Sequence, residues 1–288
     1  MTTTVPRDRV VELADGRRIG LYEYGDPDGR PVLVFHGVPA CGAGFAWADE
    51  PARARGLRLI APDRPGVGRS SGPPLHLVAD EAPRMTDLAA ALDLDRFAVW
   101  GYSGGGPYAV ACAALLGDRV TATAVAAGMG EVGTWADKDD FAKTDRQLLG
   151  LAPSHPRIAR FMLSVTARLA KASPGSAMKS FAKELSESDR ALLDGLGPPE
   201  EAMALFTAAF QNGAKGVVDD YRAIAKPWGC PFDVDGPVTI WHGDADTMVP
   251  LRHAEALAER LPAATLTVWP GEGHLGTITH VDDILATL

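Results

Sequence analysis

The stretch Phe97-Ala98-Val99-Trp100-Gly101-Tyr102-Ser103-Gly104-Gly105 indicates the fold more strongly than any other part of the chain. Its first four residues form a short apolar run, typical of a strand buried on both faces, and residues 107–116 continue as a helical pattern. The Gly-x-Ser-x-Gly pattern between them predicts a sharp strand-to-helix turn with Ser103 at its tip. Glycines two residues before and after the serine allow the strand and the helix to approach closely. The free N–H groups that begin this helix face any anion formed beside Ser103.

A serine at such a turn becomes a nucleophile when a histidine removes its proton and a carboxylate orients that histidine. In this architecture the carboxylate follows the serine along the chain and the histidine comes last. Asp246 follows an apolar run at 238–241, and His274 follows one at 266–269. The separations are 246 − 103 = 143 and 274 − 246 = 28 residues, so these groups meet only if the sheet brings strand ends together. The carboxyl ends of parallel strands do so, and we expect Ser103, Asp246 and His274 to form a catalytic triad.

Continuous apolar runs recur along the chain and alternate with helical patterns. Strands are predicted at 32–35, 57–61, 97–100, 120–126, 238–241 and 266–269, and helices at 86–94, 107–116 and 253–261. Before them, residues 10–13 and 18–24 flank an Asp15-Gly16 turn and predict a β-hairpin. Strands that alternate with helices favour right-handed crossovers, so the expected fold class is α/β, with a mainly parallel sheet flanked by helices.

Residues 130–228 interrupt this alternation, because they contain helical patterns and no convincing strand. Helices are predicted there at 137–149, 157–172, 177–185, 189–193, 200–210 and 217–224. We therefore expect a core domain formed by residues 1–129 and 229–288, with residues 130–228 inserted as a helical cap, or lid. Apolar side chains of this insertion are expected to pack its own small core and to select a hydrophobic substrate.

The motifs resemble those of the α/β-hydrolase superfamily and occur in that family's order. They are His36-Gly37-Val38-Pro39, the run Asp63-Arg64-Pro65-Gly66-Val67-Gly68-Arg69-Ser70, the turn around Ser103, the loop from His242-Gly243 through Asp246 to Val249-Pro250, and Gly273-His274. The resemblance extends from about residue 10 to the C-terminus, and the insertion contributes least to it. It implies an α/β-hydrolase fold, esterase-like or lipase-like activity, Asp246 as the acid and His274 as the base.

The same resemblance implies an oxyanion hole formed by the backbone N–H groups of Val38 and Gly104. A tetrahedral intermediate concentrates negative charge on one oxygen, and loss of one preorganised donor costs about 3–4 kcal/mol. Because Val38 would contribute only its backbone, its side chain is expected to matter mainly through fit.

Several neighbouring residues offer alternatives. Asp244 could replace Asp246 as the acid, and Glu131, shortly after the 120–126 strand, is a second substitute. His36 is expected to be structural, and Asp63 and Arg64 are expected to form a pair that stabilises their turn and shapes the site wall. Related haloalkane dehalogenases and epoxide hydrolases use an aspartate where this chain has Ser103, which argues against those activities. The segment after His36-Gly37 also departs from the aminopeptidase pattern, which weakens that alternative.

Composition restricts the partners and the environment. The 288 residues include 28 basic and 37 acidic side chains, and the net charge of −9 argues against a nucleic acid or an anionic membrane as partner. The three cysteines lie far apart and show no pairing pattern, which indicates a reducing compartment and no thiolate zinc site. Residues 1–10 lack the apolar region of a signal peptide, and no run of 18 apolar residues occurs. We expect a cytoplasmic protein without a metal or other cofactor, and leave its oligomeric state open.

These patterns favour a serine hydrolase that cleaves a carboxylic ester, lactone or thioester of a small hydrophobic substrate through an acyl-enzyme. The same triad also allows acyl transfer, perhydrolysis, C–C bond cleavage or aminopeptidase-like peptide cleavage. A ligand sensor that has lost catalysis is an alternative of another class, and tight ligand binding without turnover would distinguish it.

Overall fold

The computed structural model describes residues 7–195 and 197–288. Most of residues 1–10, for which the sequence predicts no signal peptide, lies outside the described residues. The strands are β1 (Arg7–Glu12), β2 (Arg18–Gly25), β3 (Arg30–Phe35), β4 (Leu57–Pro62), β5 (Phe97–Tyr102), β6 (Val120–Ala126), β7 (Val238–Gly243) and β8 (Ala264–Trp269). They form one sheet in the order β1-β2-β4-β3-β5-β6-β7-β8. The predicted hairpin of β1 and β2 is confirmed, and β2 also pairs antiparallel with β4. All pairs from β4 through β3 to β8 are parallel, as the fold class requires.

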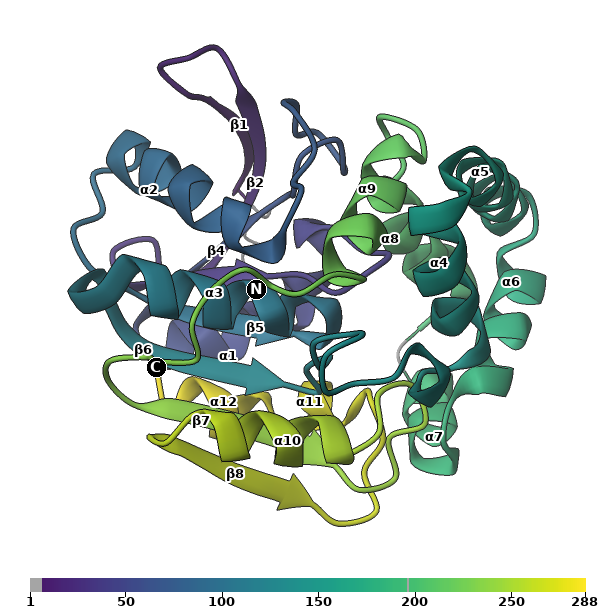
Figure 1. The fold of residues 1–288 in the computed structure, drawn as a ribbon. Coiled ribbons are helices and arrows are strands. Elements are labelled where there is room, and N and C mark those ends of the chain that lie inside the picture. Colours follow the sequence, from purple (N-terminus) through teal and green to yellow (C-terminus); the bar gives the residue numbers. More distant parts are fainter. Residues whose placement is uncertain (1–6, 196) are drawn as a thin grey trace.

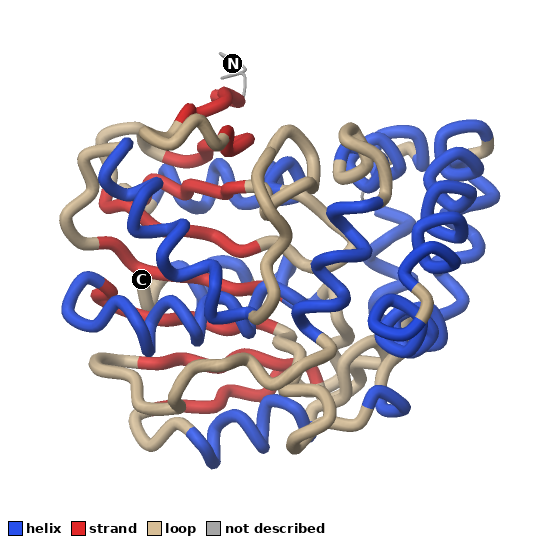
Figure 2. Tube along the Cα trace, turned by 45° about the horizontal axis from the view of Figure 1, so that its top comes forward, coloured by secondary structure: helices blue, strands red, loops and turns tan. Residues whose placement is uncertain are grey.

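Helices cover both faces of this sheet (Figure 2). Those of the core are α1 (Asp49–Ala54), α2 (Glu81–Ala91), α3 (Gly106–Leu116), α10 (Arg252–Arg260), α11 (Gly276–Thr279) and α12 (Val281–Leu285). The helix predicted at 86–94 begins earlier, because Pro83 occupies the first turn of α2, where its missing N–H needs no partner. It also ends earlier, and Asp93 just beyond it has a φ of +54°.

The central strands are apolar on both faces because both faces are buried. In β3, Leu33 and Phe35 belong to one hydrophobic cluster, whereas Val32 and Val34 belong to the other. Successive side chains of a strand point to opposite faces, so alternate residues fill alternate clusters. The continuous apolar runs of the sequence are therefore explained by helices packed on both sides.

The inserted segment 130–228 is called the cap below. Its helices are α4 (Lys143–Ser154), α5 (Pro156–Ala172), α6 (Pro174–Phe181), α7 (Glu187–Gly195), α8 (Pro199–Ala208) and α9 (Lys215–Ile224). They follow β6 and precede β7 in the chain, and Figure 1 shows them gathered beyond the arrowheads of β6 and β8. The helix predicted at 137–149 starts too early, because Asp137 instead caps a 3-10 turn at Lys138–Asp140.

Within the described residues, no helix combines the length and the apolar character that crossing a membrane would require.

Candidate active site

Ser103 lies at the turn between β5 and α3. It has a φ of +54°, a region that side-chain-bearing residues rarely adopt, and it is half-buried. Such local strain persists only where the surrounding structure enforces it. The predicted strand-to-helix turn is therefore present, and it holds the serine at the carboxyl end of the central strand β5.

The two glycines of the Gly-x-Ser-x-Gly pattern are required by close backbone contacts. A Cβ atom on Gly101 would lie 2.5 Å from the carbonyl oxygen of Gly105. A Cβ atom on Gly105 would lie 2.0 Å from the carbonyl oxygen of Phe35 in β3. The strand, the helix and the neighbouring strand can thus come together only when both positions lack side chains.

We expect Gly105→Ala to lower the free energy of unfolding by about 3 kcal/mol or more, because a backbone oxygen cannot move aside as a side chain can. Gly150→Ala is the matched control: no atom lies within 4 Å of its added Cβ, and Gly150 lies inside α4. It should leave stability unchanged or raise it by up to about 1 kcal/mol. Urea unfolding followed by circular dichroism measures both, and equal stabilities of the two variants would contradict the packing argument.

Asp246 and His274 meet as predicted, although they are 28 residues apart. His274 Nδ1 lies 2.7 Å from Asp246 Oδ2, and both side chains are buried. The other oxygen, Asp246 Oδ1, accepts the backbone N–H groups of Met248 at 2.8 Å and Val249 at 2.9 Å. Because an ionised carboxylate only accepts, the Nδ1 atom of His274 carries the proton and its Nε2 atom is left to accept one.

Electrostatics reinforce this pair. Burial opposes the charged form of Asp246, but the charge of His274 and the hydrogen bonds from His242 and His274 outweigh burial and hold the pKa of Asp246 well below its usual range. Burial likewise disfavours the charged form of His274, yet the charge of Asp246 and the hydrogen bond to it raise the pKa of His274 above its usual value. The protonated form of His274 is thus stabilised beside Asp246.

His242 also supports the carboxylate, a role that its position in the sequence did not indicate. Its Nε2 atom lies 2.7 Å from the carbonyl oxygen of Val249 and 3.3 Å from Asp246 Oδ2. A carbonyl only accepts, so this nitrogen donates and points its proton toward both oxygens.

Tyr102, the residue before Ser103, contacts the histidine of this pair. Its hydroxyl donates a hydrogen bond to the carbonyl oxygen of His274 at 3.3 Å, and the rings of Tyr102 and His274 are 5.2 Å apart. The alternative acids lie elsewhere. Asp244 Oδ1 accepts the N–H of Gly271 at 2.7 Å, and Glu131 Oε1 accepts the N–H of Trp228.

The loop 36–38 passes close to Ser103. A Cβ atom on Gly37 would lie 3.2 Å from Ser103 Cβ, and one on Gly104 would lie 3.2 Å from Val38 N. Arg64 donates to the carbonyl oxygens of His36 at 2.7 Å and Gly37 at 2.9 Å. In a planar trans peptide the C=O and N–H groups point in opposite directions, so the N–H of Val38 points away from Arg64. The arrangement fits the expected use of this N–H as an oxyanion donor.

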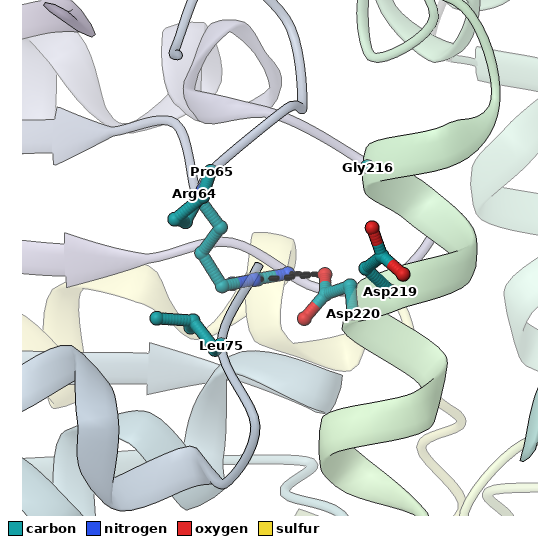
Figure 3. Close-up of a pocket in the computed structure, with 6 residues that line it drawn as sticks. All are labelled: Arg64, Pro65, Leu75, Gly216, Asp219 and Asp220. Carbon is teal, nitrogen blue, oxygen red and sulfur yellow. Dashed lines mark hydrogen bonds and ion pairs between the residues drawn. The ribbon is translucent and has the colours of Figure 1, made fainter. Parts of the chain in front are cut away.

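Arg64 is held by the cap and not by its neighbour Asp63, which corrects the pairing expected from the sequence. Its side chain forms an ion pair of 2.6 Å with Asp220 of α9, and both groups are buried. Figure 3 shows this pair bridging a crevice whose other lining residues are Pro65, Leu75, Gly216 and Asp219. Asp63 instead accepts backbone N–H groups of Gly42 and Arg69. None of the predicted triad lines this crevice, so we assign it to the contact between cap and core.

Asp220→Ala is expected to lower the free energy of unfolding by about 3–5 kcal/mol, because it leaves the Arg64 charge buried without its partner. The control Asp219→Ala removes a carboxylate of the same helix that pairs with the more exposed Lys215 and Arg222, and should cost less than about 1 kcal/mol. Denaturant unfolding distinguishes the two, and a similar small loss for both variants would refute this account of the buried pair.

The cap places a further ionisable group near His274. Asp145 of α4 accepts the Tyr221 hydroxyl of α9 at 2.5 Å, and burial raises the pKa of Asp145 to about 6 despite that bond. Its charge also contributes to raising the pKa of His274. The helical pattern of the insertion gave no sign of this carboxyl, because only the packed cap brings it toward the core.

The sheet topology and the strand-to-helix serine turn define an enzyme of the α/β hydrolase class. The chain belongs to the alpha/beta hydrolase fold family, whose family model matches residues 30–281.

The chain is also similar to particular members. It is 28% identical over 294 residues to the non-heme chloroperoxidase of Streptomyces lividans, covering 96% of this chain and 98% of that protein. The esterase EaEST from Exiguobacterium antarcticum superposes with a TM-score of 0.71 at 20% identity, covering 96% of each chain. The bromoperoxidase from Bacillus anthracis gives a TM-score of 0.71 at 18% identity, covering 97% of each chain. These structural likenesses confirm the fold.

Proposed function

We propose that the protein is a serine hydrolase that cleaves a carboxylic ester, lactone or thioester. The observation that carries this proposal is the buried hydrogen bond of 2.7 Å between His274 and Asp246, together with the contact of His274 with Tyr102, which precedes Ser103 at its φ of +54°. The half-buried Ser103 follows the central strand β5 directly, and the tautomer of His274 leaves its Nε2 atom to accept a proton.

In the proposed reaction, Ser103 Oγ attacks the acyl carbon while His274 Nε2 takes its proton. The carbonyl oxygen becomes an oxyanion, which the N–H groups of Val38 and Gly104 bind. His274 then protonates the leaving alcohol or thiol, and an acyl-enzyme remains on Ser103. Water attacks this ester with His274 again as base, which releases the acid and restores the serine.

A small hydrophobic substrate fits this assignment. The cap lies beyond the carboxyl ends of the strands, where loops after parallel strands form binding sites (Figure 1). The net charge of −9 disfavours anionic substrates. The free thiols of Cys41, Cys112 and Cys230 support a reducing, cytoplasmic environment.

A fluorophosphonate probe and a substrate series test the proposal. Wild-type protein should be labelled on Ser103, as shown by peptide mass spectrometry, and should hydrolyse p-nitrophenyl esters. A series from acetate to long chains, followed by lactones and amides, then defines the acyl preference. The proposal fails if Ser103 stays unlabelled and no ester, lactone or thioester is turned over.

The acid limb of the pH profile should report the ionisation of His274. The base must be neutral, so kcat/KM should rise with pH until His274 has lost its proton. Because the carboxylates around it raise the pKa of His274, the midpoint is expected above the ordinary histidine value of about 6.5. Initial rates measured from about pH 5 to about pH 9 give this midpoint. A midpoint below about 6 would contradict the assignment of His274 in this environment.

Perhydrolysis is a second candidate, favoured by similarity to a protein named non-heme chloroperoxidase along 96% of this chain. Hydrogen peroxide would replace water as the nucleophile toward the acyl-enzyme: one peroxide oxygen bonds to the acyl carbon, and the bond to Ser103 breaks. The peroxide proton passes through His274 to Ser103, which yields a peracid. Measuring peracetic acid during turnover of p-nitrophenyl acetate with hydrogen peroxide tests this, and formation of acetate alone would exclude it.

A further inference from the structure

Asp189 in cap helix α7 contacts the backbone of the segment that carries the base. Its Oδ2 atom accepts the N–H of His274 at 2.9 Å, and its Oδ1 atom accepts the N–H of Leu275 at 2.7 Å. Asp189 is only 1% exposed. One carboxylate from the cap therefore binds two consecutive backbone donors of the catalytic loop, just before α11 begins at Gly276. Charge-assisted bonds of this kind are stronger than neutral ones.

Gly273, directly before the base, is shaped to receive this carboxylate. A Cβ atom at Gly273 would lie 2.2 Å from Asp189 Oδ2 and 2.2 Å from Ser186 Oγ. Ser186 in turn accepts the N–H of Asp189 at 3.1 Å, which fixes the start of α7. The glycine of the Gly273-His274 motif thus leaves room for a cap side chain, a reason that its place in the sequence does not reveal.

We propose that Asp189 is a positioning residue for the general base. It holds the loop of His274 so that Nε2 has the orientation needed for proton transfer only while α7 is packed against the core. This inference rests on the proposed serine-hydrolase function, because it assigns Asp189 a role through His274. Misplacement of a catalytic group by about 1 Å can cost about 10²-fold in rate. Loss of the two buried hydrogen bonds that hold this loop should therefore slow catalysis strongly.

Asp189 also belongs to the charges that surround His274. The groups facing this histidine are Asp246 from the loop after β7, Asp189 from α7, Asp145 from α4 and Tyr102 from β5. Burial disfavours protonated His274, whereas the three carboxylates favour it and together raise its pKa. Removing the Asp189 charge should therefore lower the pKa of His274 and shift the acid limb of kcat/KM to lower pH.

Asp189→Asn is the first test, because it keeps the size of the side chain but replaces one acceptor oxygen with a donor nitrogen. We expect kcat to fall about tenfold to 10²-fold, KM to change less than about twofold, and the acid limb to move to lower pH. Asp194→Asn is the matched control, since Asp194 lies on the same helix and is exposed. Its kinetics and pH profile should equal those of the wild type.

A double-mutant cycle separates positioning from general damage to the fold. In Gly273→Ala the added methyl group occupies the space of the Asp189 carboxylate, so this variant should reproduce the kinetic loss of Asp189→Ala. The double variant should lose no more than Gly273→Ala alone, because the contact of Asp189 is already removed in that single variant. Losses that multiply would overturn the proposed contact.

Two measurements do not depend on turnover. Hydrogen exchange should become faster at the amides of His274 and Leu275 in Asp189→Asn, and NMR titration of the His274 ring should show a lowered pKa. Unchanged exchange at both amides together with an unchanged titration would overturn the inference, even if the wild type hydrolysed esters. If instead the wild type were neither labelled nor active, the proposed function would fail while these two measurements still decided whether Asp189 holds the loop.

Discussion

Ser103→Ala is expected to lower kcat at least about 10⁴-fold on any ester that the wild type hydrolyses, and to abolish labelling by a fluorophosphonate. Removing Oγ leaves no atom to form the proposed acyl-enzyme, while the N–H groups of Val38 and Gly104, the proposed oxyanion donors, can still polarise a bound carbonyl. The residual rate should therefore exceed that of water alone. Circular dichroism and thermal unfolding are needed beside the rate, because the alanine that replaces Ser103 must adopt the same φ of +54°.

His274→Ala should cost nearly as much as Ser103→Ala, and combining the two should cost little more than either one. The reason is that the hydroxyl and the imidazole act as one unit: the serine is a weak nucleophile without its base, and the base has no task without the serine. Rates of the two single variants and the double variant on one substrate test this. Independent, multiplying losses would mean that Ser103 and His274 do not share a step.

The second large effect is expected for Asp246→Asn, with a loss of about 10⁴-fold in kcat near neutral pH. An amide nitrogen facing His274 Nδ1 would favour the tautomer with its proton on Nε2, the atom that has to accept the serine proton. Loss of the carboxylate charge also removes the main cause of the raised pKa of His274. The acid limb of the profile should accordingly move to lower pH while the plateau falls.

Asp244→Asn provides the matched control for that prediction. Asp244 lies two residues away and is exposed, and its carboxylate binds the N–H of Gly271 and not His274. Its replacement should change kcat less than about threefold, in line with small effects of surface substitutions. If Asp244→Asn lost more activity than Asp246→Asn, the acid would have to be reassigned.

Two buried carboxylates of the cap, Asp220 and Asp189, contact the core near Val38 and His274. Asp220 holds Arg64, which binds the carbonyl oxygens of the loop before Val38, and Asp189 holds the loop of His274. Burial of these charges is tolerable because each carboxylate has charged or backbone donors at hydrogen-bond distance. The cap therefore contributes to the positions of both loops, besides any contact that it makes with substrate.

Sequence patterns predict well the features that depend on residues close together in the chain, such as strands and tight turns. The apolar runs locate β3 to β8, and in the central strands β3 and β5 they reflect burial on both faces of the sheet. The Gly-x-Ser-x-Gly spacing predicts the turn of Ser103, because only glycine fits where backbones touch. Helix boundaries are less accurate: a helix is predicted at 86–94, whereas α2 spans Glu81–Ala91 and includes Pro83 in its first turn.

The contacts that assemble the site depend on residues distant in sequence. Asp189 precedes His274 by 85 residues, and Asp220 follows Arg64 by 156, so no local pattern marks either carboxylate as a partner. Their helical spacing indicates only that they belong to cap helices. The strand-to-helix turn and the order of Ser103, Asp246 and His274 follow from local sterics and chain order, and they can be predicted from the residues alone. Which carboxylates hold the loops of Val38 and His274 is decided only by packing of the cap against the core. An aspartate can hold a loop only where packing buries it within hydrogen-bond distance of the donors.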